Sequence, residues 1–178
     1  MTPTAVHIRP GLRLPDITLP ATDGPAICLA AQKGRSVVAI YPWTGRPGLP
    51  NPPDWDTIEG AHGSTPELEG FRDLAPSFAA ANVGLFALSR QTTEYQRELA
   101  ARLRLSFPIL SDVEGQFSAS LDFPSFTTGG EICLKRLTLL ICNGSIQHVF
   151  FPVKDPVRHA SEVLVALQSE SSSASSTE

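Results

Sequence analysis

Cysteine is scarce in this sequence of 178 residues, which contains only three thiols. Cys28, Cys133 and Cys142 include no CxxC pair and no Cys/His spacing typical of a zinc site. Each lies in an apolar stretch with the character of a strand, so we predict buried core thiols rather than a redox pair. The four histidines are scattered as well, without the spacing of metal ligands. We therefore expect neither a metal nor a cofactor.

The sequence also lacks long hydrophobic runs and clusters of positive charge. No apolar run approaches the roughly 18 residues that a membrane-spanning helix needs, and the N-terminus has no signal-peptide core. The formal net charge is −4, with 18% charged and 42% hydrophobic residues. We expect a cytoplasmic protein, monomeric or homodimeric, with no membrane and no nucleic acid among its partners.

Apolar runs alternate with amphipathic stretches along the chain, a pattern that predicts an α/β domain with a central mixed sheet. A hairpin is expected at Asn143-Gly144. After two short strands within 17–29, the predicted strands are 36–41, 83–89, 107–111, 132–142 and 146–152. The predicted helices, packed on the sheet, are 65–82, 92–104, 114–121 and 156–168.

We expect residues 1–168 to form one domain. The last ten residues, 169–178, have the polar, low-complexity sequence SESSSASSTE and are predicted to be disordered.

Segment 42–63 contains five prolines and both tryptophans, Trp43 and Trp55, so neither a helix nor a central strand fits it. Loops of this length in compact domains are often functional. The two indoles could anchor the loop to the body of the protein, or they could line a pocket, with Tyr41 beside them. We predict that this segment folds over the mouth of a pocket.

The residues after this segment carry a helix-start signal, STPE. Ser64 or Thr65 is the predicted N-cap, Pro66 occupies the first turn, and Glu67 completes a capping box with Ser64. His62, next to Ser64, would suit a hydrolase, but the chain has no Gly-x-Ser-x-Gly elbow here.

Five segments, in this order, resemble the peroxiredoxin family over about residues 11–168. They are GLRLPDITLPATDG, VVAIYP, GSTPELEGFRD, FPILSD and LKRLTLLICNGSIQHVF. In the bacterioferritin-comigratory type of that family, Gly-Cys-Thr stands where this chain has Gly63-Ser64-Thr65. The resemblance implies a thioredoxin-like fold of the peroxiredoxin type.

The resemblance also implies a site. In the family, a cysteine at the first turn of a helix becomes a thiolate and attacks a peroxide, and an arginine stabilises the developing charge. Ser64 matches the attacking cysteine and Arg136 matches the arginine, so Arg136 should point toward Ser64. The implied substrate-binding residues are Pro42, Trp43, Thr44 and Thr65.

This sequence departs from the family motif in two ways. Pro42 lies 22 positions before Ser64, rather than the 7 of the motif, so Thr44 is the available source of the motif's hydroxyl. The position of a second cysteine holds Glu69, so an outside thiol such as thioredoxin or glutathione would have to act as reductant.

A serine hydroxyl cannot form the soft, oxidisable thiolate that peroxide reduction requires. Ser64 is either an engineered replacement or a natural divergence. Three functions stay open: a peroxiredoxin-type reductase of hydroperoxides seen in serine form, a cysteine-independent enzyme performing a non-redox step on a small organic substrate of specialised metabolism, and a catalytically silent binding protein.

Overall fold

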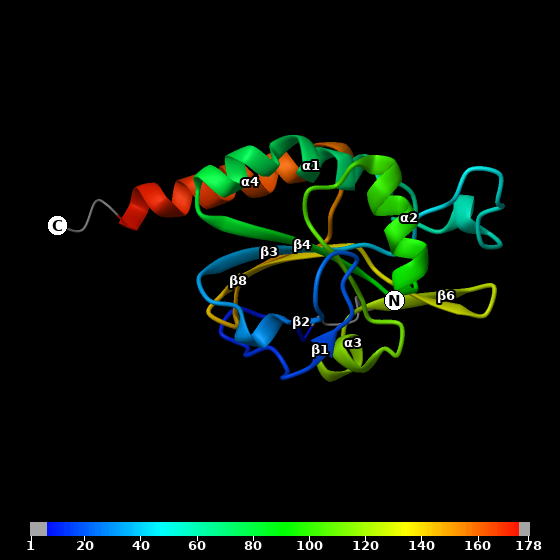
Figure 1. Ribbon diagram of the computed structural model, residues 1–178, viewed down its shortest axis with the longest axis horizontal. Helices are drawn as coiled ribbons and strands as arrows, with labels where there is room; N and C mark the ends of the chain where they lie inside the picture. The colour runs from blue at the N-terminus through cyan, green and yellow to red at the C-terminus, as the bar shows by residue number, and fades with distance from the viewer. Residues whose placement is uncertain (1–6, 175–178) are drawn as a thin grey trace.

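A five-stranded mixed sheet forms the centre of the molecule in the computed structural model, which describes residues 7–174 (Figure 1). The strand order is β5-β4-β3-β8-β9, with the first three strands parallel and the last two antiparallel. The strands are β3 (Arg35–Ile40), β4 (Val83–Ser89), β5 (Ile109–Ser111), β8 (Leu137–Cys142) and β9 (Ser145–Phe150). The mixed sheet predicted from the sequence is confirmed.

Helices cover both faces of this sheet. One face carries α1 (Ser64–Ala80), α2 (Thr93–Leu103) and α4 (Pro156–Ala174), with α1 and α4 side by side at the top of Figure 1. The other face carries α3 (Gln116–Ser120) and the short pair β1 (Thr18–Leu19) and β2 (Ile27–Cys28). Successive β3 residues alternate between the two apolar cores, because side chains of a strand point to opposite faces.

The predicted single strand 132–142 is wrong. Its first part, β7 (Glu131–Leu134), leaves the central sheet and pairs with β6 (Ser125–Thr128), a strand that the sequence reasoning missed. The pairing of β3 with β8 ends at Ile40 and Leu137, and Pro42 follows, so no strand remains beside residues 132–136. The break between β7 and β8 lies at Lys135 and Arg136.

The predicted tail is also partly wrong. Helix α4 continues to Ala174, so residues 169–174 are helical, and 175–178 lie outside the described residues. The remaining predicted helices and central strands agree with the structure to within two residues at each end. Among residues 7–174, no helix is long and apolar enough to cross a bilayer.

Candidate active site

Ser64 is the first residue of α1, and its side chain is buried. The residue before it, Gly63, caps the helix at φ 109°, a conformation that suits glycine, and an added Cβ would lie 2.7 Å from Pro156 Cγ. No side chain of the described residues caps α1. The predicted capping role of Ser64 or Thr65 is therefore wrong, and the positive helix end stays open at Ser64.

Arg136 reaches Ser64 from the β7–β8 break. Its Nη2 donates to Ser64 Oγ at 3.1 Å and to the backbone carbonyl of His62 at 3.1 Å. Weaker contacts run from the same nitrogen to the carbonyls of Gly60 and Ala61. The predicted orientation of Arg136 toward Ser64 is confirmed, and one guanidinium ties the end of segment 42–63 to the start of α1.

Glu67 holds the other side of that guanidinium. Arg136 Nη1 donates to Glu67 Oε2 at 2.7 Å, and both side chains are almost fully buried. Burial raises the pKa of Glu67 to about 7, although the arginine beside it acts in the opposite direction. Glu67 Oε1 and Arg136 Nε have no hydrogen-bond partner among the described residues.

The predicted capping box is consequently wrong, because the Glu67 carboxylate serves Arg136 and not the helix end. The sequence did contain a signal for this role. Glu67 lies three residues after Ser64 and immediately before the core residue Leu68, so its side chain points inward on the face that carries Ser64.

A cavity of about 250 Å³ opens above Ser64. Its floor is the start of α1, and most of its remaining wall belongs to segment 42–63, including both tryptophans. The lining residues are Trp43, Thr44, Gly45, Asn51, Trp55, Ala61, His62, Gly63, Ser64, Thr65 and Pro66. The prediction that this segment folds over a pocket is confirmed in its geometry, and the two tryptophans both line the pocket and anchor the segment.

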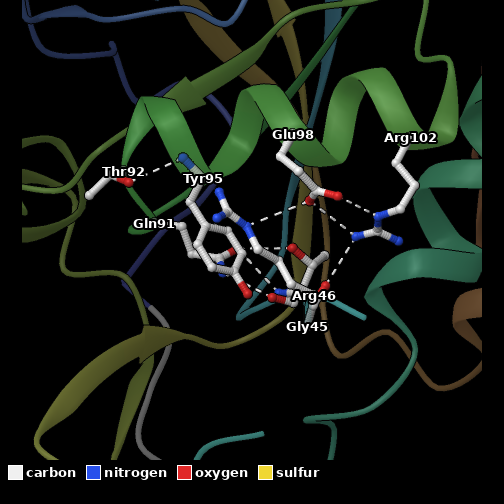
Figure 2. A network of polar contacts seen from close by, with 8 residues as sticks. Gly45, Arg46, Gln91, Thr92, Tyr95, Glu98 and Arg102 are labelled. Carbon is white, nitrogen blue, oxygen red and sulfur yellow. Dashed lines mark hydrogen bonds and ion pairs between the residues drawn. The ribbon is translucent and has the colours of Figure 1, made fainter. Parts of the chain in front are cut away.

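Polar contacts fix the first part of segment 42–63 to α2 (Figure 2). Arg46 lies over the Tyr95 ring, 4.1 Å from its centroid, and approaches Glu98 at 3.7 Å. Arg102 pairs with Glu98 at 2.8 Å and donates to the carbonyl of Gly45 at 3.1 Å. Helix α2 therefore holds the segment at the point where it leaves the body of the protein.

The later part of the segment packs on the β6–β7 hairpin. Trp55 is buried and contacts Phe126, with ring centroids 6.0 Å apart. Thr128 Oγ1 donates to the carbonyl of Pro53. Both the segment and the hairpin project from the same side of the molecule in Figure 1, and each covers apolar surface of the other.

Two residues assigned to the pocket from the sequence lie elsewhere, and a third lines the cavity with its hydroxyl turned away. Pro42 and Tyr41 are buried and do not line the cavity. Thr44 does line the cavity, but its hydroxyl donates to Gln91 Oε1 at 3.1 Å, and its backbone N–H and C=O bond the same amide. The hydroxyl proton of Thr44 is thus directed away from the pocket. Gln91 is held there because it also pairs with the buried N–H and C=O groups of Thr44.

His62 forms a separate pair with Asp56, Nε2 to Oδ1 at 2.6 Å, in an exposed position on the cavity wall. Ser64 Oγ bonds Arg136 and has no hydrogen bond to His62, so the two do not form a nucleophile and base. Among the described residues, no three His, Cys, Asp or Glu side chains gather as metal ligands do.

Comparison with known proteins identifies the family of this chain. Residues 9–164 match a family model described as redoxin. This chain belongs to the redoxin family.

Its relatives within that family are peroxiredoxins. The chloroplastic peroxiredoxin Q of Oryza sativa subsp. japonica is 27% identical over 160 residues, which cover 89% of this redoxin and 66% of the rice protein. The redoxin thus spans about two thirds of that relative's length. Its lineage is that of thiol peroxidases.

Solved structures agree with the thioredoxin-like peroxiredoxin fold that we predicted. The bacterioferritin comigratory protein of Xanthomonas campestris superposes with a TM-score of 0.72 at 25% identity, covering 91% of this chain and 99% of that one. Peroxidoxin BcpB from Mycobacterium tuberculosis gives a TM-score of 0.74 at 25% identity, with coverages of 92% and 98%.

The cysteines of this redoxin lie outside the cavity wall. Cys133 is buried under Trp55 and Ala61, and burial, with the nearby Glu131, raises the pKa of its thiol to about 11. It is protonated at neutral pH and therefore a poor nucleophile. Cys28 and Cys142 are only half-buried, so the prediction of buried core thiols holds for Cys133 alone.

Proposed function

We propose that the cavity over Ser64 is a peroxiredoxin-type site for hydroperoxides, present here with serine at the position of the attacking group. The observation that supports this best is the contact between Arg136 Nη2 and Ser64 Oγ at 3.1 Å, at the uncapped start of α1. Two sources of positive potential, the guanidinium and the helix end, meet at one side-chain atom. Such an environment stabilises an anion at position 64 and the charge that develops on a bound peroxide oxygen.

With serine at this position the site binds a hydroperoxide but does not reduce it. A thiolate at position 64 would attack the distal oxygen of the hydroperoxide, forming an S–O bond while the O–O bond breaks. Sulfur supplies the electron pair, and the leaving alkoxide takes a proton to become an alcohol. Serine oxygen cannot be oxidised in this way.

The oxidised group would then need an external thiol, because none of the three cysteines lines the cavity. One thiol would displace the sulfenic oxygen as water and form a mixed disulfide, and a second would release the restored thiol. Thioredoxin or glutathione is the proposed class of donor.

The test is thiol-dependent consumption of cumene hydroperoxide by the chain as it stands and by Ser64→Cys. We expect turnover in Ser64→Cys alone, and none in the chain as it stands or in Ser64→Ala. Ser64→Cys with no turnover above the serine form, although folded and able to bind the hydroperoxide, would overturn the assignment.

The pair Asp56–His62 favours a second candidate, an enzyme for an acid–base step on a small organic substrate. His62 lines the cavity, and the carboxylate at 2.6 Å fixes the orientation of its ring. The discriminating assay is deuterium uptake from solvent into small carbonyl acids, followed by NMR. Uptake with the serine form that is lost in His62→Gln supports this candidate, and uptake unchanged by that substitution rejects it.

A further inference from the structure

A second cavity, of about 500 Å³, lies at the β7–β8 break and shares no lining residue with the cavity over Ser64. Its volume falls in the range of small-molecule sites, roughly 300–1,000 Å³. The walls come from the end of segment 42–63, from β6, from the break itself and from the segment between β9 and α4. The lining residues are Glu59, Gly60, Phe126, Lys135, Arg136, Phe151, Pro152, Val153 and Lys154.

Positive charge is concentrated at this cavity. The chain contains only three lysines, and two of them, Lys135 and Lys154, line it. Within the described part of the chain, neither ammonium group has an ion-pair partner. Arg136 is already paired with Glu67, so the two lysines supply the unbalanced charge. Among the lining residues, the exposed Glu59 is the one carboxylate that opposes them.

The rest of the wall is apolar. Phe126, Phe151 and Val153 are half-buried and present side-chain surface to the cavity, together with Pro152. A bare inorganic anion would leave this surface in water, and a neutral apolar molecule would not use the two ammonium groups. The combination matches a ligand with an apolar body and one anionic end.

We propose that this cavity binds a small carboxylate with an aromatic body. The carboxylate would lie between Lys135 and Lys154, and the ring would cover the apolar wall formed by Phe126, Phe151 and Val153. This proposal is independent of the function of the Ser64 cavity.

The probe for the test is 2-naphthoate, titrated into the full chain by isothermal calorimetry, with the neutral 2-naphthamide as its matched control. We expect saturable binding of the naphthoate that weakens with added NaCl and is at least several-fold tighter than binding of the amide. Equal affinity for the two compounds, or no saturable binding of either, would overturn the proposal.

Lysine variants locate the bound ligand. Lys135→Ala and Lys154→Ala should each weaken naphthoate binding about five-fold, the effect of removing one exposed charge pair. Lys33→Ala removes the same charge near Asn143, at the opposite end of β8, and should leave binding unchanged. Trp43→Ala, which alters the Ser64 cavity, should also leave it unchanged. Loss of binding in Trp43→Ala with none in the lysine variants would place the ligand elsewhere and reject the site.

Discussion

Arg136 shows most clearly how single residues set up this site. It is buried, it follows the exposed Lys135 at a strand break, and it contacts a carboxylate, a hydroxyl and backbone carbonyls at once. A planar group with five donors suits such a position, and lysine could not replace these contacts. The Glu67 carboxylate is the one anion among these partners, and its ionisation controls the local charge balance.

The first prediction concerns the pH dependence that Glu67 imposes. Its pKa in the folded state, about 7, lies above the ordinary value of 4.5, so between these pH values the folded chain holds a proton that the unfolded chain has lost. Protonation of Glu67 therefore contributes to the free energy of unfolding. The contribution is fully present below pH 4.5 and is lost as pH rises through 7, at no more than about 1.4 kcal/mol per pH unit. Urea unfolding at several pH values should show that Glu67→Gln gains stability relative to the parent chain between pH 5 and 8. A difference that is constant with pH would contradict the assigned environment.

The second prediction concerns His159, which causes the opposite pH dependence of stability. Its ring is buried and bonds Thr138 Oγ1 at 2.8 Å, and burial lowers its pKa to about 4. Between pH 6.5 and 4 the unfolded chain binds a proton that the folded chain excludes, so stability falls as pH decreases, by up to about 1.4 kcal/mol per unit. His159→Gln, which does not titrate, should flatten this acid limb of the stability profile. An unchanged acid limb in that variant would show that other groups cause it.

At the scale of elements, segment 42–63 and the β6–β7 hairpin depend on each other. Trp55 is the main apolar contact between them, with Phe126, Ala61 and Cys133 around it. Gly129 in the hairpin turn approaches Pro53 so closely that an added Cβ would lie 2.7 Å from its Cδ. A two-stranded hairpin is marginal in isolation, so we expect the β6–β7 hairpin to depend on the segment that packs against it.

The third prediction follows from that dependence. Trp55→Ala should cost about 3 kcal/mol, at the lower end for a buried aromatic ring, and should release both elements together. Hydrogen–deuterium exchange should become faster in 50–60 and in 125–134, with β3 and β4 unchanged.

Trp43→Ala is the control for this experiment. Trp43 pairs with the Tyr95 ring on α2 and is a partly buried neighbour of the cluster around Trp55, so its removal should affect 43–46 more than 125–134. Fast exchange confined to 50–60 in Trp55→Ala would show that the hairpin is ordered without the segment.

The sequence predicted the central elements because their patterns are local. The apolar run 36–41 and the Asn143-Gly144 turn each determine the structure within a few residues. The break at Lys135 depends instead on where β3 ends, almost 100 residues earlier in the chain, and no local pattern records it. Glu67 was misinterpreted for the same reason, since its true partner Arg136 is 69 positions away and the capping box is a local motif.

At the scale of the whole molecule, a peroxiredoxin-type scaffold holds its site between a helix start, a strand break and an inserted segment. The lineage and the fold are established by the family match and by the solved structures. The roles of Ser64, Arg136 and Thr65, the cytoplasmic location and the choice between monomer and homodimer stay predictions.

The most direct measurement of the central proposal is a single-turnover reaction of Ser64→Cys with one equivalent of hydroperoxide, followed by mass spectrometry of the intact chain. The proposal predicts that position 64 gains one oxygen atom, that dimedone traps it as a sulfenic acid, and that Cys28, Cys133 and Cys142 stay unmodified. Adding Arg136→Lys should slow this step by about 100-fold, the effect of removing one stabilising donor from a charged transition state. Oxidation elsewhere in the chain, or a reaction at position 64 no faster than that of a free thiol in solution, would contradict the account.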